Sequence, residues 1–443
     1  MSELDGLLAA TKQSPNIKRL EISAGAVSHI PQILHDIFGP KPAFLFADEK
    51  SWAAAGPQII AALNQADIAY QRHIEKASPK PKPSVELSQK FAAMIAQNDC
   101  IAVAIGSGVM NDVVKHASFS LERDYLCVAT AVSMDGYTSA GAPLSEKGFK
   151  KTIQCKPARA IIADLDILAA APAQMTSWGY SDLAGKIPAG ADWILADAVG
   201  VEKIDPESFA MVQHHLRQWL SNPEAVASGE LQAMQNLFVG LSMVGFAMER
   251  HGSSRPASGA DHQIAHLWEM EDHQYQGEYV SHGACVAVGS LASLALHHYF
   301  LSQDISKLDV QAIIQAAPDM DATIADIHAQ LGDGEIALRA IEETRAKDLS
   351  QSQHEERLLA IAQGFADIKK KMQSHLPSLV EFRSDLAKAG APAKASDIGI
   401  DAKKLSQTIY NARFIRSRYT ILDVLDETGL LKPAIAAIVP AIV

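Results

Sequence analysis

The alternation of apolar and polar positions divides the chain into two parts of different character. Within the first 165 residues, short β-rich apolar runs alternate with amphipathic stretches that have helical spacing. The apolar runs are Ala43–Phe46, Ile101–Ile105, Leu126–Val128 and Arg159–Ala163, and helical stretches such as Ser51–Asn64 and Ser84–Gln97 lie between them. This alternation is typical of an open parallel sheet with crossover helices. We therefore predict a Rossmann-like α/β domain over residues 1–165.

From residue 166 onward the pattern becomes helical. Runs of β-branched residues disappear, and long Ala-, Leu-, Met- and Gln-rich segments take over, punctuated by prolines. One of them, Tyr279–Gln303, contains no Asp, Glu, Lys or Arg and is long enough to span a bilayer. Its three histidines and several serines favour a buried helix in a large domain instead. We predict an all-helical domain over residues 166–443, with the apolar tail LLKPAIAAIVPAIV packed on the body or on a partner subunit.

The composition is that of a folded, acidic globular protein. Of the 443 residues, 48% are hydrophobic and 20% are charged, and 39 Lys and Arg against 51 Asp and Glu give a net charge of −12. Such a charge disfavours binding to nucleic acid through phosphate neutralisation. The four cysteines are scattered and form no CxxC pair, and the first residues lack a basic start followed by an apolar core. We expect a cytoplasmic protein that has neither nucleic acid nor a membrane as partner.

A glycine turn in the first part is a candidate phosphate site. The segment IAVAIGSGVMNDVVKHAS is typical of a strand, a tight turn and an amphipathic helix. Gly106 and Gly108 allow the backbone to approach a diphosphate, which the helix N-terminus would attract. A tight turn that needs glycine only for space is the alternative. Asp48 ends the run AFLFAD, where an acid can bind both ribose hydroxyls of a dinucleotide, and a helix cap is the alternative there.

The second part of the chain contains a candidate metal site. Asp182 lies in TSWGYSDLAGK, His262 and His266 are four residues apart and so share one helix face, and His282 follows in YVSHGACVAVG. One carboxylate and two imidazoles make an open three-ligand site for a divalent ion. For each histidine taken alone, a hydrogen-bonded position in the core or at the surface is the alternative.

Several segments, in one order along both halves of the chain, resemble a known family. They are the Gly-Ser-Gly turn with NDVVK, then ATAVSMDGYTSAGAPL, SDLAGK, RPASGADHQIAHLWEM and SHGACVAVG. Together they resemble bacterial NAD-dependent sn-glycerol-1-phosphate dehydrogenases, of the iron-containing alcohol dehydrogenase and dehydroquinate synthase superfamily. The resemblance resumes in RSRYTILDVLDETGLL. It implies a Rossmann-like N-terminal domain, a helical C-terminal domain and an active site in the cleft between them.

The resemblance also implies ligands for a metal and for NAD. One catalytic ion, zinc or nickel in related enzymes, would be bound by Asp182, His262 and His282. The nicotinamide end of the cofactor would lie along Thr130 and Ser133. The cofactor diphosphate would contact the glycine turn and the next helix at Gly106, Ser107, Gly108, Asn111 and Asp112.

Three further residues are implied at the substrate. Asp135 in SMDG matches an acid that contacts substrate hydroxyls, and His266 matches a histidine that sits beside the metal; either is a plausible proton relay. Arg255 matches an arginine that grips the substrate phosphonate in dehydroquinate synthases, and an arginine fork suits a phosphate dianion. A surface or ion-paired arginine is the alternative for Arg255.

The implied activity is the reversible reduction of dihydroxyacetone phosphate to sn-glycerol 1-phosphate with NADH, by an enzyme that forms a homodimer. A dehydroquinate synthase-like lyase and a glycerol or polyol dehydrogenase of the same superfamily are the first alternatives. Dehydroquinate synthases use Glu as the first metal ligand, where this chain has Asp182. A non-catalytic binding protein that has kept the fold is the other alternative.

Overall fold

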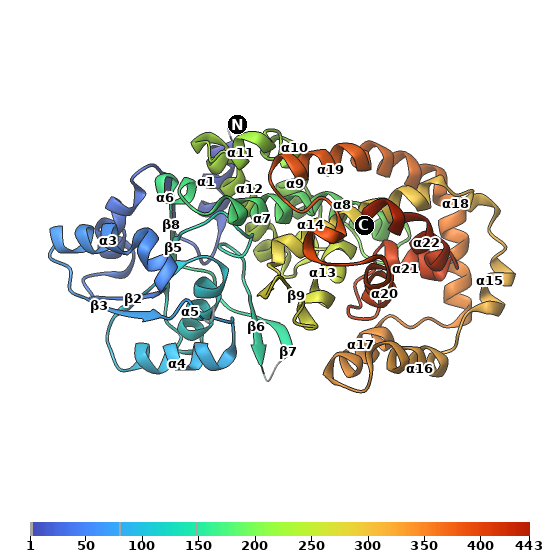
Figure 1. Cartoon of the computed structure of the whole chain (residues 1–443), viewed down its shortest axis with the longest axis horizontal. Helices are drawn as coiled ribbons and strands as arrows, with labels where there is room; N and C mark the ends of the chain where they lie inside the picture. The colour runs from blue at the N-terminus through green and yellow to red at the C-terminus, as the bar shows by residue number, and fades with distance from the viewer. Residues whose placement is uncertain (1–2, 79–80, 147–148) are drawn as a thin grey trace. The chain divides into compact units, whose positions relative to one another are not determined.

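The computed structural model describes residues 3–78, 81–146 and 149–443 (Figure 1). The chain forms two compact units, and each consists of two stretches of sequence. Unit 1 consists of Met1–Leu183 and His214–Ser253, and unit 2 consists of Ala184–Gln213 and Ser254–Val443.

Unit 1 contains a six-stranded parallel sheet, which confirms the predicted Rossmann-like class. In sheet order the strands are β1 (Arg19–Ser23), β8 (Ala160–Asp164), β5 (Tyr125–Ala129), β4 (Ile101–Gly106), β2 (Ala43–Asp48) and β3 (Tyr70–Glu75). The four inner strands correspond to the four predicted apolar runs. The edge strands β1 and β3 were not predicted, because they are only partly buried and carry polar residues such as those of YQRHIE.

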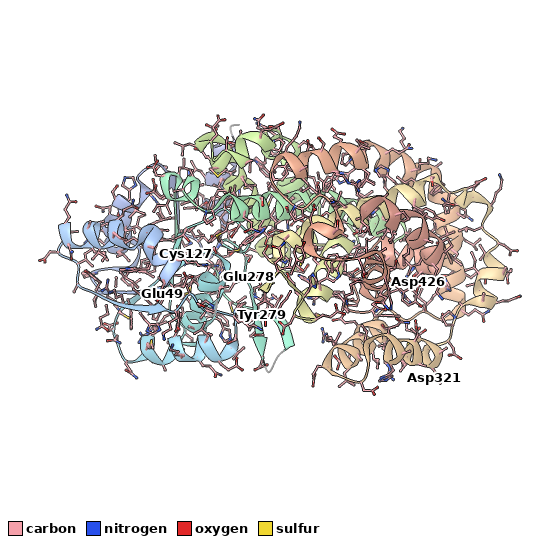
Figure 2. The ribbon with its side chains drawn as sticks, in the orientation of Figure 1. Glu49, Cys127, Glu278, Tyr279, Asp321 and Asp426 are labelled. Carbon is pink, nitrogen blue, oxygen red and sulfur yellow. The ribbon has the colours of Figure 1, made fainter. Side chains whose placement is uncertain are left out.

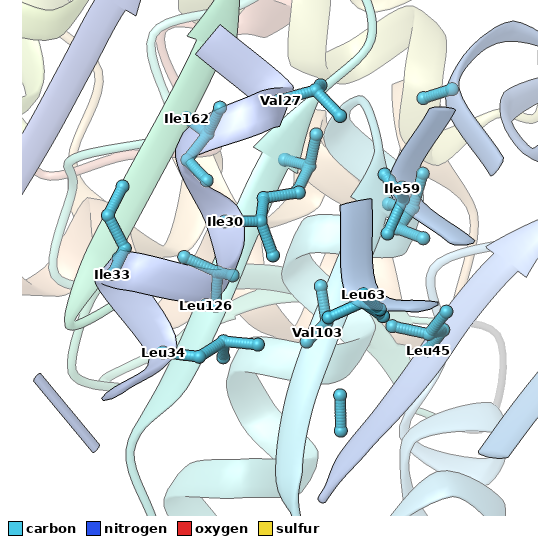
Figure 3. Close-up of a cluster of buried hydrophobic side chains, with 14 of the residues drawn as sticks. Val27, Ile30, Ile33, Leu34, Leu45, Ile59, Leu63, Val103, Leu126 and Ile162 are labelled. Carbon is cyan, nitrogen blue, oxygen red and sulfur yellow. The ribbon is translucent and has the colours of Figure 1, made fainter. Parts of the chain in front are cut away.

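Helices pack an apolar core against this sheet (Figure 3). The crossover helices are α3 (Glu49–Gln65), α4 (Val85–Ala96) and α5 (Gly108–Ser120). Ile30 and Ile59 from the helical layer meet Val103, Leu126 and Ile162 from the strands, and all five side chains are fully buried. An antiparallel hairpin, β6 (Ala142–Glu146) and β7 (Phe149–Ile153), follows β5 in the sequence.

Unit 1 is larger than the predicted domain that ends at residue 165. Helices α6 (Leu165–Ala169), most of α7 (Ala173–Ala184), α10 (Leu216–Trp219), α11 (Pro223–Ala227) and α12 (Leu231–His251) belong to it. Long-range bonds explain the difference. Ser14 Oγ donates to Glu249 Oε2 at 2.8 Å, and Thr138 Oγ1 donates to the Ser242 carbonyl at 2.7 Å, so α12 is tied to the N-terminal part of the chain.

Unit 2 is helical, as predicted, apart from one short hairpin. Its helices include α8 (Lys186–Ala198), α9 (Pro206–Gln213), α13 (Ala260–Met270), α14 (His282–Ser302), α15 (Val310–Ala316), α16 (Met320–Leu331), α17 (Glu335–Ala346), α18 (Gln351–His375), α19 (Leu379–Lys388), α20 (Ala402–Ala412), α21 (Ile421–Glu427) and α22 (Leu431–Ile442). The hairpin joins α13 to α14 through β9 (Gln274–Tyr275) and β10 (Glu278–Tyr279). Figure 2 labels Glu278 and Tyr279 on β10, where both are exposed.

Two helices of the described residues are long and apolar enough to cross a membrane, α12 and α14. In α14 89% of the apolar window is buried inside the protein, and in α12 72%. Burial on this scale is what core helices of a folded domain show, and it agrees with the prediction for Tyr279–Gln303. The apolar tail is α22, which packs its buried face against α14 and α20, so the predicted packing on the body is confirmed.

Candidate active site

The order of the strands in unit 1 reverses between β2 and β4. β3 lies beyond β2, whereas β5, β8 and β1 lie on the other side of β4. In parallel α/β sheets, ligands bind at the carboxyl ends of the strands where the order reverses. Asp48 is the last residue of β2 and Gly106 is the last residue of β4, so two predicted cofactor residues lie at this position of the sheet.

The glycine turn brings helix α5 close to the end of β4. A Cβ atom on Gly106 would lie 2.6 Å from Cβ of Met110, so this position has no room for a side chain. Ser107 is the N-cap residue of α5 but makes no side-chain capping bond. Because the first amides of a helix lack intrahelical partners, the turn presents N–H donors and the positive end of the helix dipole. Both the phosphate interpretation and the steric one are compatible with this geometry.

Asp48 caps a helix. Its Oδ1 accepts hydrogen bonds from the amides of Lys50 at 2.8 Å and Ser51 at 2.9 Å, at the start of α3. The capping alternative considered for this residue is therefore present. Contact with a ribose stays a prediction.

Asn111 and Asp112 lie buried on α5 and contact protein groups. Asn111 Nδ2 donates to the Gly136 carbonyl at 3.3 Å, and Asp112 lies 3.3 Å from Nζ of Lys115. The fully buried Lys115 also donates to the carbonyls of Gly136 at 2.8 Å and Gly141 at 2.9 Å. These side chains hold the loop over residues 130–141. Sequence reasoning missed Lys115, whose signal was a lysine among the apolar residues of an amphipathic helix.

The loop over residues 130–141 carries three predicted residues. The Thr130 amide donates to the Gly106 carbonyl at 3.2 Å, and Ser133 is half-buried. The Asp135 amide donates to Oδ2 of the buried Asp182 at 3.0 Å. Asp182, near the end of helix α7, is thus joined to the loop over residues 130–141 through a backbone amide.

A glycine on α7 makes that approach possible. A Cβ atom on Gly179 would clash with the carbonyl oxygen of Val132, so the backbone of α7 touches the backbone of the loop directly. The position of the loop is therefore fixed by main-chain contact as well as by Lys115.

The three predicted histidines of unit 2 meet. His262 and His266 lie one turn apart on α13, and His282 is the first residue of α14. The ring centroids are 5.3 Å apart for His262 and His282, and 5.7 Å apart for each of the other two pairs. Imidazoles at this spacing can bind the same metal ion.

A carboxylate holds each of two rings at Nδ1. Asp261 Oδ2 lies 2.6 Å from Nδ1 of His262, and Glu269 Oε1 lies 2.6 Å from Nδ1 of His282. An ionised carboxylate only accepts hydrogen bonds, so Nδ1 donates and Nε2 carries the lone pair. A metal-binding histidine usually makes this kind of bond with its other nitrogen. Sequence reasoning did not single out Asp261 and Glu269.

Asp261 fixes the start of α13. It is fully buried, and its Oδ1 accepts the Gly259 amide at 2.9 Å. A Cβ atom on Gly289 of α14 would clash with the Asp261 carbonyl, so α13 and α14 are in backbone contact there. Asp192 Oδ2 accepts the Ala260 amide at 2.7 Å, which anchors the same helix end to α8.

His266 and Glu269 define a second possible ligand set. His266, Glu269 and His282 each offer a ligand atom, and these atoms lie within 4.8 Å of one another. Desolvation holds the pKa of His266 well below its ordinary value, so its ring is neutral near pH 7.

Arg255 is fully buried and contacts protein groups. Its Nη1 donates to the Tyr419 carbonyl at 3.1 Å, its Nη2 donates to the Asp192 carbonyl at 3.0 Å, and its Nε lies 3.2 Å from Glu202 Oε2. Burial lowers the pKa of this guanidinium. This arrangement is the ion-paired alternative, and it does not favour the predicted contact with a substrate phosphate.

The sequence is similar to those of known proteins. Residues 21–172 match the family model of the iron-containing alcohol dehydrogenases. A glycerol-1-phosphate dehydrogenase (NAD(P)+) of Geobacillus thermodenitrificans is 27% identical over 444 residues, which cover 97% of this chain and 99% of that protein. The glycerol-1-phosphate dehydrogenase (NAD(P)+) of Bacillus subtilis is 38% identical over 191 residues, which cover 42% of this chain and 48% of that protein.

Solved structures share the fold. A probable glycerol dehydrogenase of Sinorhizobium meliloti 1021 has a TM-score of 0.59 at 15% identity, over 95% of this chain and 98% of that one. A sulfoacetaldehyde reductase of Bifidobacterium kashiwanohense, in complex with NAD+, has a TM-score of 0.56 at 15% identity, over 94% and 96%. The chain therefore shares the fold of these solved structures. Along nearly its whole length it is similar to glycerol-1-phosphate dehydrogenases, which confirms the predicted resemblance.

Proposed function

We propose that this protein is a metal-dependent oxidoreductase that reversibly reduces dihydroxyacetone phosphate to sn-glycerol 1-phosphate with NADH. The observation that carries the proposal is the pair His262 and His282, whose ring centroids lie 5.3 Å apart and whose Nδ1 atoms each lie 2.6 Å from a carboxylate oxygen. The relatives that match along 97% and 92% of the chain bear the name of this activity.

One divalent ion, zinc or nickel, is held in this proposal by Asp182, His262 and His282. One carboxylate with two neutral imidazoles suits either metal. Asp182 lies in α7, two residues before Ala184, the first residue of unit 2, so chain connectivity keeps its carboxylate near the start of that unit. A bound ion of this kind supplies a Lewis acid for the carbonyl oxygen of the substrate.

The cofactor lies in this proposal along the ends of β2 and β4. The turn of Gly106, Ser107 and Gly108 binds its diphosphate through backbone amides, and Asp48 binds its ribose. Thr130 and Ser133 line the nicotinamide end. Asn111 and Asp112 support this site by way of the loop that they and Lys115 hold. NADH supplies the hydride, and the protein supplies position and field.

Asp135 and His266 act on the substrate. Asp135 binds a hydroxyl group, and its backbone bond to Asp182 keeps it close to a metal ligand. His266 lies beside both proposed histidine ligands, with its ring centroid 5.7 Å from each of theirs, and it relays a proton between water and the substrate oxygen in this proposal. We leave Arg255 out of the phosphate site because its donors already contact Tyr419, Asp192 and Glu202.

NADH oxidation by the full chain tests the proposal. We expect oxidation that depends on dihydroxyacetone phosphate, disappears on chelation and returns with zinc or nickel. Asp182→Ala should abolish it while NADH still binds. Activity that survives removal of all metal, or that survives Asp182→Ala, would contradict the metal role.

The same assay separates the alternatives. Oxidation of glycerol by NAD with no activity on the triose phosphate would favour a polyol dehydrogenase. Turnover of a dehydroquinate synthase substrate would favour a lyase, and a protein that takes up neither metal nor NADH would favour a binding protein. We also propose a cytoplasmic location and a homodimer. Light scattering on the purified chain tests the dimer, and fractionation of cells that make the protein tests the location.

A further inference from the structure

Glu269 connects two helices at the metal-binding histidines. It lies on α13, seven residues after His262 and three after His266, so these residues share one helix face. Its carboxylate reaches the first residue of the next helix, His282, with 2.6 Å between Oε1 and Nδ1. Helix α13 therefore provides one proposed ligand, His262, and also the carboxylate that contacts the other histidine ligand, His282.

His282 needs such a partner more than His262 does. The His262 side chain is 6% exposed, and its carboxylate comes from the adjacent residue, so packing and chain geometry fix its ring together. The His282 side chain is 33% exposed, and the short hairpin β9–β10 precedes it. Ser281 caps α14 by accepting the Ala284 amide, which fixes the backbone but not the imidazole.

The bond also decides which nitrogen of His282 is available. Neutral imidazole exists as two tautomers, and only the one with its proton on Nδ1 can donate to Glu269. The lone pair then lies on Nε2. A partner that held the ring without accepting a hydrogen bond from Nδ1–H would leave both tautomers populated.

We propose that Glu269 is a positioning residue that selects Nε2 of His282 as the nitrogen that binds the metal. The proposal rests on the metal site proposed above. It differs from direct ligation by the set His266, Glu269 and His282, whose atoms also lie close enough to hold an ion. In that case Glu269 would be a ligand itself.

The first experiment reads the tautomer in the metal-free full chain. Nitrogen-15 NMR of labelled histidines separates Nδ1–H from Nε2–H, and His282→Gln identifies the signal. We expect the Nδ1–H form in the wild type and a population shifted toward Nε2–H in Glu269→Gln, because a glutamine amide can accept a hydrogen bond from Nδ1 or donate one to it. Glu269→Met should show a mixture. The matched control is Glu271→Gln on the same helix end, where Glu271 pairs with Lys404 at 2.5 Å, and it should change nothing.

The second experiment measures metal binding by competition with a chromogenic chelator. Loss of a partner of a metal-binding histidine weakens metal binding by about 10–100-fold. We expect this loss in Glu269→Met, a smaller loss in Glu269→Gln and no change in Glu271→Gln. If Glu269→Met does not fold, Glu269→Gln carries the test: a shifted His282 tautomer with weaker metal binding supports the positioning role, and an unchanged tautomer contradicts it.

The outcomes are distinct. Unchanged tautomer and unchanged metal affinity in Glu269→Met would overturn the positioning role. Equal losses in the Met and Gln variants, with the tautomer kept in the latter, would overturn it in favour of a ligand. In either case a loss of metal in His282→Ala leaves the proposed metal site standing. Metal binding that also survives His282→Ala would remove the site itself.

Discussion

The two units fix their candidate residues in different ways. Unit 1 fixes a stretch of backbone: Lys115 binds two carbonyls of the loop over residues 130–141, and Gly179 lets helix α7 touch that loop directly. Unit 2 fixes side chains, since Asp261 and Glu269 each hold an imidazole at Nδ1. A cofactor bound through amides needs an ordered main chain, whereas a metal needs oriented nitrogens. Buried polar side chains do both: in unit 1 one of them binds main-chain carbonyls, and in unit 2 two of them bind imidazole rings.

The sharpest way to break the unit 1 arrangement is to remove its buried ammonium. Lys115→Met removes one donor to Asp112 and to each of two loop carbonyls, and removal of one partner of a buried pair costs about 3–5 kcal/mol. We expect a loss of this size in urea unfolding, together with weaker NADH binding. Lys50→Met at an exposed position of α3 is the control and should fall within about 0.5 kcal/mol of the wild type. Equal effects of the two variants would contradict a specific role for Lys115.

Each unit contains a close backbone contact at a glycine, and a methyl group added at each glycine compares the two contacts. Gly179→Ala should push α7 away from Val132, and Gly289→Ala should push α14 away from Asp261. Overpacking of this kind costs about 1–3 kcal/mol. We expect the first variant to weaken NADH binding and the second to weaken metal binding. Titrations with NADH and with zinc measure the two affinities, and hydrogen exchange shows in which unit each variant loosens the structure. Loss of both ligands in both variants would contradict the assignment of one ligand to each unit.

Unit 2 also contains a carboxyl group that makes its stability depend on pH. Burial raises the pKa of Glu427 to about 7, against the opposing effect of Arg357, whose Nη1 lies 2.6 Å away. The unfolded carboxyl ionises near 4.5, so the folded state binds more protons between these values, and the free energy of unfolding falls as pH rises from about 4.5 to 7. Glu427→Gln should flatten this fall in urea unfolding at several pH values. The same slope in both proteins would show that another group is responsible.

The smallest expected effect comes from a glycine without a close neighbour. Gly364 lies inside helix α18, and a Cβ atom there would meet nothing nearer than Cδ1 of Ile368 at 3.7 Å. Gly364→Ala should therefore stabilise unit 2 by about 0.4–1 kcal/mol, through helix propensity and a less flexible unfolded chain. Thermal unfolding measures the change. A loss of stability would mean that the contrast with Gly179 and Gly289 is not a matter of space.

Much of the fold was predictable because burial leaves a local pattern. The inner strands are apolar runs since both faces of a parallel sheet are covered, whereas β1 and β3 at the edges are mixed and were missed. The predicted boundary at residue 165 differed from that of unit 1. Helix α12 belongs to that unit through bonds such as Ser14 to Glu249, which link residues 235 positions apart, and no local pattern reports them.

Sequence reasoning singled out the histidines that the structure brings together in unit 2, but it missed the carboxylates that contact them. Among the 16 histidines, His262, His266 and His282 stand out because spacing places two of them on one helix face. Asp261 and Glu269 look like ordinary helix carboxylates until the tertiary structure shows what they touch. Arg255 was chosen for the chemistry of its side chain, but its environment depends on Tyr419 and Asp192, which lie far away in the sequence.

The interleaving of the two units constrains how the polypeptide is made. The chain passes from one unit to the other three times, after Leu183, Gln213 and Ser253. During synthesis, unit 1 cannot be completed until its last helix has left the ribosome. By then residues 184–213 have been made, although the rest of unit 2 has not. No single cut of the gene yields either unit whole. Separate expression would instead require rejoining the two stretches of each unit with new linkers.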